Sequence, residues 1–184
     1  MRYVALLRGI NVGGNHRVSK DEFRQVLESL GYRDVVIYIN SGNAVFTSDS
    51  EPKTNDIQAA LEKHFGFTIP TLVLTGAAVK AIAAAIPADW TNDSPKPDKS
   101  GQKSDVLYLF DTANTPDILE KLGHKPEIEK MIYVEGAVLA NITRQNQSKG
   151  SLQKLVGSTL YEHVTIRNIA TAKKLAELTE ASAS

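Results

Sequence analysis

The chain contains no cysteine among its 184 residues. This absence excludes disulfide bonds, thiolate catalysis and thiolate metal sites, and it is typical of a cytoplasmic protein. The histidines also lack metal-ligand spacing such as His-Glu-x-x-His. They are His16, His64, His124 and His163. We therefore expect cytoplasmic localisation, no metal and no cofactor.

Long hydrophobic runs are missing as well. The apolar segment Tyr3–Leu7 ends at Arg8 and is too short for a signal sequence or a membrane span. Residues 77–86 are rich in alanine but contain Lys80, so we expect a helix packed against a core. The sequence predicts no membrane association.

Neither sign of charge is in excess. Lys plus Arg and Asp plus Glu number 21 each, and the isoelectric point is about 6.9. A balanced chain has no global field that attracts nucleic acid or an anionic membrane, so any anion site must be local. Nucleic-acid binding is disfavoured, and it stays open only through the basic groups of the second half.

The sequence contains the same order of expected strands and helices in each of its two halves. The expected strands span residues 3–8, 35–39, 44–47 and 70–75, and then 106–110, 130–134, 137–142 and 164–167. Helical spacing of apolar residues lies between the first and second strand and between the third and fourth strand of each half. Both halves read βαββαβ. We therefore predict an α+β fold of two ferredoxin-like βαββαβ units joined by a helix and a polar linker.

The boundaries follow from breaker residues. Residues 88–104 have no apolar period and contain Pro95, Pro97 and Gly101, which indicates a polar linker anchored by Trp90. We expect residues 1–87 to form the first unit with its connecting helix. Residues 105–184 are expected to form the second unit with a C-terminal helix.

Two sets of apolar residues are expected to form the cores. They are Phe23, Leu27, Val45 and Leu61 in the first unit, and Leu109, Leu122, Leu139 and Leu155 in the second. The strands Tyr3–Leu7 and Val106–Phe110 do not alternate between apolar and polar residues. Such strands are covered on both faces.

A candidate ligand site lies at one edge of the first sheet. In a ferredoxin-like unit the first strand pairs antiparallel with the third, so the loops at Arg8 and at residues 40–43 meet. The predicted ligand-binding residues there are Arg8, Asn11, Ser41 and Asn43. Glycine and asparagine also dominate turns for backbone reasons alone, so a purely structural role stays open.

A second candidate set lies in the second half. Arg144 and Lys149 follow one expected strand, and Arg167 ends another at the same sheet edge. Arginine forks match phosphate or carboxylate groups. Asn168 is expected to cap the final helix. The predicted ligand-binding residues of this half are Lys149, Arg167, Asn168 and Lys174, and they form either a second site or part of the first.

Three motifs give the chain a resemblance to the domain of unknown function 1697 family, which is bacterial. They are Leu6-Leu7-Arg8-Gly9-Ile10-Asn11-Val12-Gly13-Gly14, Tyr38-Ile39-Asn40-Ser41-Gly42-Asn43 with Val45-Phe46, and Thr165-x-Arg167-Asn168-x-x-Thr171-x-x-Lys174-Leu175. Ile169-Ala170 and Gly150-Ser151 depart from the family pattern. The resemblance implies a two-part α+β fold and a cytoplasmic bacterial protein, and it implies no activity or catalytic residue.

Taken together, these residues favour a protein that binds a small polar anion, such as a nucleotide or a phosphate ester. Whether it also catalyses a reaction stays open, as do the ligand's identity and the oligomeric state. Two alternatives remain. One is a nucleic-acid accessory protein, and the other is a non-catalytic module that forms a homodimer.

Overall fold

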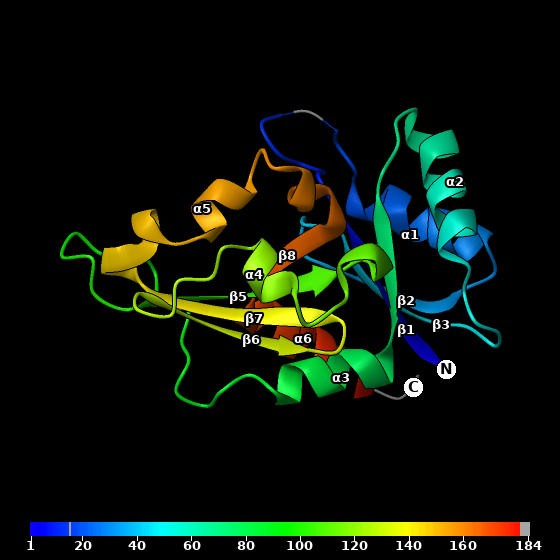
Figure 1. Cartoon of the computed structure of the whole chain (residues 1–184). Coiled ribbons are helices and arrows are strands. Elements are labelled where there is room, and N and C mark those ends of the chain that lie inside the picture. The colour runs from blue at the N-terminus through cyan, green and yellow to red at the C-terminus, as the bar shows by residue number, and fades with distance from the viewer. Residues whose placement is uncertain (15, 181–184) are drawn as a thin grey trace. The chain divides into compact units, whose positions relative to one another are not determined.

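The computed structural model describes residues 1–14 and 16–180, and its elements are labelled in Figure 1. The contacts within the chain divide it into two compact units. Unit 1 contains Met1–Lys80 and the described residues from Lys174 onward, and unit 2 contains Ala81–Lys173. The last four residues of the predicted second unit lie outside the described residues. The predicted boundaries at residues 87 and 105 stay a prediction.

Unit 1 contains a four-stranded antiparallel sheet in the order β2-β3-β1-β4. Its strands are β1 (Arg2–Leu7), β2 (Arg33–Tyr38), β3 (Asn43–Thr47) and β4 (Thr71–Thr75). Helix α1 (Lys20–Ser29) follows β1, and α2 (Thr54–Phe65) follows β3. Ser19 caps α1 because its side chain accepts a hydrogen bond from the Glu22 amide at 3.2 Å, as the Ser-x-x-Glu pattern predicts. Gly66 ends α2 in the left-handed conformation.

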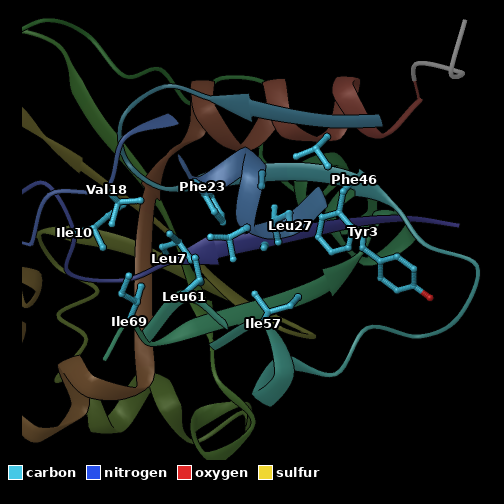
Figure 2. Close-up of a cluster of buried hydrophobic side chains, with 14 residues drawn as sticks. Tyr3, Leu7, Ile10, Val18, Phe23, Leu27, Phe46, Ile57, Leu61 and Ile69 are labelled. Carbon is cyan, nitrogen blue, oxygen red and sulfur yellow. The ribbon is translucent and has the colours of Figure 1, made fainter. Parts of the chain in front are cut away.

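Both helices pack on one face of this sheet, where apolar side chains form the core of unit 1 (Figure 2). The predicted core residues Phe23, Leu27 and Leu61 are confirmed. Val45 is fully buried, but it is absent from this cluster, whereas its neighbours Ala44 and Phe46 belong to it. Successive strand residues point to opposite faces, so Val45 leaves β3 on the other side. Its assignment to this core was wrong.

Unit 2 contains a second four-stranded antiparallel sheet, in the order β6-β7-β5-β8. Its strands are β5 (Gln102–Leu109), β6 (Glu129–Val134), β7 (Ala137–Thr143) and β8 (Val164–Asn168). The connections are short helices, namely η1 (Asp111–Ala113), α4 (Ile118–Lys121), η2 (Arg144–Lys149), α5 (Leu152–Leu155) and η3 (Thr159–His163). Helices α3 (Gly76–Ala84) and α6 (Ile169–Glu180) each begin in one unit and end in the other.

The core of unit 2 contains Leu109, Leu122 and Leu155, as predicted. Leu139 is fully buried but lies outside this cluster, and its neighbours Val138 and Ala140 are inside it. The reason is again the two-residue period of a strand. Strands β1 and β5 are buried at almost every position, which confirms that both of their faces are covered.

The predicted linker is more ordered than its composition indicates. Strand β5 begins at Gln102 because Gln102–Ser104 pair with Asn141–Thr143 of β7, so the last three residues of the predicted linker belong to a strand. Within the remainder, the Asp93 carboxylate accepts hydrogen bonds from the Gln102 amide at 2.7 Å and from Thr91 at 2.8 Å. Trp90 is buried, as expected of an anchor.

The chain therefore has an α+β fold of two four-stranded antiparallel sheets with helices. In residues 1–14 and 16–180, every helix is too short or too polar to cross a membrane.

Candidate functional site

The first loop and the β2–β3 turn meet at one edge of the unit 1 sheet. Leu6 of β1 lies opposite Asn43 of β3, and the Leu7 amide donates to the Gly42 carbonyl at 2.8 Å. Beyond the strands, the Asn11 side chain donates to the Asn40 carbonyl at 2.7 Å. The predicted strand pairing is confirmed, and it brings the two polar segments into direct contact.

Two of the predicted ligand residues hold these loops in place. The Asn11 amide donates to the Val18 carbonyl at 3.0 Å and accepts from the Val18 amide at 2.9 Å. Asn43 is fully buried, and its side chain donates to the Tyr38 carbonyl at 3.0 Å and to Ser41 Oγ at 2.8 Å. Through these bonds, both residues have the structural role that the sequence analysis kept as an alternative to ligand binding.

The same loops contain strained backbone. Asn11, His16 and Ile39 have φ values of 56°, 52° and 52°. Asparagine tolerates the left-handed region, but a β-branched residue such as isoleucine is a true outlier there. Such strain costs about 1–3 kcal/mol per residue, and it clusters at ligand sites and switches. The loops at this edge are therefore held in one unusual conformation.

A solvent-open hollow of about 580 Å³ lies where these loops meet the start of α1. We call it the α1 hollow. Its described lining consists of Asn11, Gly14, Arg17, Val18, Ser19, Lys20, Asp21 and Asn40. Arg17 and Lys20 are exposed cations on either side of the helix cap, and Asp21 is the only acidic residue in this described lining. The first amides of α1 add a partial positive charge.

Arg8 and Ser41 do not belong to the described lining of the α1 hollow, although Ser41 follows Asn40, which does. Arg8 follows β1, is half-buried, and donates its backbone amide to the Pro70 carbonyl at 2.9 Å. Ser41 is half-buried in the β2–β3 turn and accepts the Asn43 bond. A direct role for either residue in binding stays a prediction.

The second predicted set is more dispersed. Asp105 of β5 lies opposite both Ala140 and Asn168, so the ends of β7 and β8 share one sheet edge, as predicted. Asn168 accepts a bond from the Thr171 amide at 2.8 Å, as a helix cap does. Arg167 and Asn168 are consecutive in β8, so their side chains leave the strand on opposite faces.

The two lysines of this set are exposed. Lys149 ends η2, where its carbonyl accepts a bond from Lys125 Nζ at 2.7 Å. Lys174 belongs to unit 1 and forms an ion pair with Glu177 at 2.9 Å, which raises the pKa of Lys174.

Arg167 is the most buried of the predicted ligand residues in unit 2. Its guanidinium donates to Thr165 Oγ1 at 2.9 Å and to the Ile166 carbonyl at 2.8 Å. Burial lowers the pKa of Arg167 to about 10, although Tyr108 and Tyr161 act in the opposite direction. Burial likewise raises the pKa of Tyr108, with Arg167 opposing that shift.

Replacing Tyr108 by phenylalanine is expected to raise the free energy of unfolding by about 1–2 kcal/mol. The Tyr108 side chain is fully buried, and no described residue forms a hydrogen bond with its hydroxyl. Leaving a buried polar group unpaired costs about 1–3 kcal/mol. Urea denaturation measures the change. Tyr133→Phe is the control, because the Tyr133 hydroxyl donates to Asn114 at 3.1 Å and its loss should lower stability. A destabilised Tyr108→Phe variant would contradict the prediction.

Sequence reasoning located this edge but missed Arg17 and Lys20. Both flank Ser19, so cations placed around a predicted helix cap were the available signal. Across the part of the chain that the structure describes, no group of three or more His, Asp or Glu residues is arranged to hold a metal ion.

Comparison with other proteins agrees with the motifs around Arg8 and Asn40. The sequence model of a family described as "Protein of unknown function (DUF1697)" matches residues 1–139, which confirms the predicted resemblance. A solved structure, that of the conserved bacterial protein SP0830 from Streptococcus pneumoniae, is 29% identical in sequence with a TM-score of 0.75. The alignment covers 97% of this chain and 98% of that one. No curated protein is significantly similar to the chain.

Proposed function

The chain belongs to the DUF1697 family, whose function is unknown, and we propose from its own geometry that it binds a small anion, such as a nucleotide or a phosphate ester, in the α1 hollow. The observation that carries this proposal is the position of Arg17 and Lys20 beside the first turn of α1, in a hollow walled by two bonded loops.

The charge distribution supports an anion. The whole chain is neutral, but the described lining of the α1 hollow has two cations and one carboxylate. The first amides of an α-helix point toward a bound anion, and the helix dipole favours negative charge there. A volume of about 580 Å³ lies within the range of small-molecule sites.

The rigidity of the walls supports a binding site rather than an ordinary turn. The Asn11 side chain donates hydrogen bonds to the carbonyls of Val18 and Asn40, and so joins the first loop to the β2–β3 turn. The Asn43 side chain holds that turn through its bond to the Tyr38 carbonyl. A site whose walls are already ordered loses less conformational entropy when a ligand binds. The strained conformation of Ile39 fits the same interpretation, because strain persists where the surrounding structure enforces it.

The identical strand order of the two sheets supports one further part of the proposal. Each order begins with the second strand of its unit and continues through the third, first and fourth strands. We infer a duplication of a ferredoxin-like unit, with residues 88–101 as the connection before β5. Arg8, Ser41, Lys149 and Arg167 remain proposed contributors to ligand binding in their respective units.

Replacing both Arg17 and Lys20 by glutamine is expected to abolish anion binding in the α1 hollow without loss of stability. Both side chains are exposed, so their charge matters for binding more than for folding. The measurement is thermal stability with and without pyrophosphate and AMP. At about 100 times the dissociation constant, a ligand adds about 2.7 kcal/mol to the stability of the wild type. The double variant should lose the part of this gain that comes from the α1 hollow.

Lys63→Gln provides the matched control, because Lys63 is an exposed lysine of α2 outside the α1 hollow. It should retain binding. Arg8→Ala tests the predicted contribution of Arg8. This substitution should weaken binding and leave stability nearly unchanged. If the wild type binds neither probe and sedimentation shows a dimer, the anion-binding proposal fails and the homodimerising module is favoured.

A further inference from the structure

A second basic hollow lies in unit 2, formed by η2 and the segment before β5. It has a volume of about 310 Å³. Its described lining is Pro95, Lys96, Lys99, Arg144, Gln145, Gln147, Ser148 and Gln153. We call it the η2 hollow. Its described lining contains three cations and no acidic residue, whereas the charges of the whole chain are balanced.

Arg144 is held in a fixed position by neutral groups. Its Nε and one terminal nitrogen donate to the Asp93 carbonyl, the former at 3.1 Å, and the other terminal nitrogen donates to Gln147 Oε1 at 2.9 Å. The loop that carries Asp93 is itself fixed, because the Asp93 carboxylate accepts from the Gln102 amide. None of the described carboxylates forms a salt bridge with Arg144. The Arg144 charge favours the ionised form of the Asp93 and Asp105 carboxyl groups through space, but neither carboxyl group forms a salt bridge with Arg144.

Lys96 and Lys99 bring two more charges to the same hollow. The Lys99 amide donates to the Lys96 carbonyl at 3.0 Å, so a tight turn carries both lysines. Both side chains are exposed, and neither forms a salt bridge with any residue that the structure describes. A planar guanidinium with two mobile ammonium groups is suited to the several oxygens of a phosphate group.

A small cavity of about 20 Å³ adjoins the η2 hollow, and the two share Gln147 and Gln153 as lining residues. This inner cavity has room for about one water molecule. Two buried carboxylates line it, Asp105 at 7% exposure and Glu129 at 5%. Asn141 lines it as well.

The two carboxylates of the inner cavity differ in their partners. The Glu129 carboxylate already accepts bonds from the Lys125 and Ser151 amides, each at 3.0 Å. Asp105 has an ion pair with Lys103 at 3.3 Å, and burial raises the pKa of its carboxyl although Lys103 opposes the shift. Asp105 therefore retains the capacity to accept a hydrogen bond from a hydroxyl group in the cavity.

We propose that the η2 hollow binds the phosphate ester of a polyol, with the phosphate group at Arg144, Lys96 and Lys99 and one hydroxyl group in the inner cavity at Asp105. The hydroxyl donates its hydrogen bond to the carboxylate. The site lies in unit 2 and uses none of the residues that line the α1 hollow. It is therefore independent of the proposed function of unit 1.

The test is isothermal titration of the whole chain with two probes, inorganic phosphate and glycerol 3-phosphate. We expect glycerol 3-phosphate to bind more tightly. Arg144→Gln should weaken both probes by about tenfold or more, because it removes charge-assisted hydrogen bonds. Lys173→Gln is the matched control, an exposed lysine of unit 2 outside this hollow, and should bind both probes as the wild type does.

Asp105→Ala separates the inner cavity from the basic hollow. It removes a negative charge, so the affinity for inorganic phosphate should stay or rise, whereas the preference for glycerol 3-phosphate should disappear. If the alanine variant does not fold, Asp105→Asn should reduce the same preference.

Two results would overturn the proposed site. One is the absence of binding by the wild type, and the other is unchanged binding by both Arg144→Gln and the double variant Lys96→Gln/Lys99→Gln. If the Asp105 variants still prefer glycerol 3-phosphate to inorganic phosphate, the proposed role of the inner cavity is wrong. The Arg17 and Lys20 variants should bind glycerol 3-phosphate here normally, which distinguishes this site from the α1 hollow.

Discussion

Replacing Gly42 by alanine is expected to lower the free energy of unfolding by about 2–5 kcal/mol. Gly42 has a φ of 74°, a conformation that costs an L-residue about 1–2 kcal/mol. A Cβ atom at this position would lie 2.6 Å from Leu7 Cβ and 2.8 Å from Ile10 Cδ1. Relieving that overlap requires backbone shifts, which typically cost about another 1–3 kcal/mol.

The matched control for this variant is Gly66→Ala. Gly66 has a φ of 78°, but nothing lies within 4 Å of the added Cβ, so only the conformational cost of about 1–2 kcal/mol applies. Urea denaturation of both variants gives the difference due to contact with Leu7 and Ile10. If the two glycines prove equally tolerant of alanine, the β2–β3 turn does not pack against β1 as described. Because this turn also carries Asn40, the Gly42→Ala variant should lose anion binding in the α1 hollow.

Replacing Phe23 by alanine should cost about 3–5 kcal/mol of stability, the range for a buried phenylalanine in a well-packed core. Phe23 is 1% exposed and belongs to the cluster between α1, α2 and the sheet (Figure 2). It also lies one turn beyond the cap of α1, so its packing fixes the helix end that lines the α1 hollow.

Phe65→Ala supplies the comparison within the same core. Phe65 is only partly buried at the end of α2, and it packs against the cluster from outside. Its loss should cost less than half as much as that of Phe23. Equal losses at the two positions, measured by denaturation at one pH, would mean that the assignment of buried and peripheral residues is wrong.

The sequence carried enough information for the strands and their pairing, because apolar runs and turn residues separate them clearly. It did not show which apolar residues share a face. Val45 and Leu139 lie in strands with both faces buried, so hydrophobicity is uniform along the strand and the two-residue period is hidden. The start of β5 was missed for a related reason, since Gln102–Ser104 pair through backbone bonds and are not apolar.

The candidate site was predictable in place but not in chemistry. Antiparallel pairing of β1 and β3 is enough to bring the two Asn- and Gly-rich loops together. The amides of Asn11 and Asn43 are used within those loops, and a sequence does not distinguish an asparagine that binds a ligand from one that binds the backbone. Arg17 and Lys20 resemble any other exposed cations until the fold places them beside one hollow.

In the second half, too, the sequence did not show which basic residues line the same hollow. Arg144, Lys149 and Arg167 were expected to converge, because they follow strands that share an edge. Arg144 lines the η2 hollow, whereas Lys149 and Arg167 are outside its described lining. Lys96 and Lys99 lie in a segment that composition identified only as a linker, and their contribution depends on tertiary bonds between Asp93 and Arg144.

The order in which the chain visits the two units has a consequence for its synthesis. The chain leaves unit 1 after Lys80 and returns at Lys174. The guanidinium of Arg2 then donates to the Leu178 carbonyl at 3.1 Å, and Gly76 lies against Thr179. A ribosome that adds about 5–20 residues per second therefore leaves β1 without these last contacts for roughly 5–20 s, while all of unit 2 emerges. Unit 2 is one continuous segment, whereas unit 1 can complete its contacts only once α6 has been synthesised.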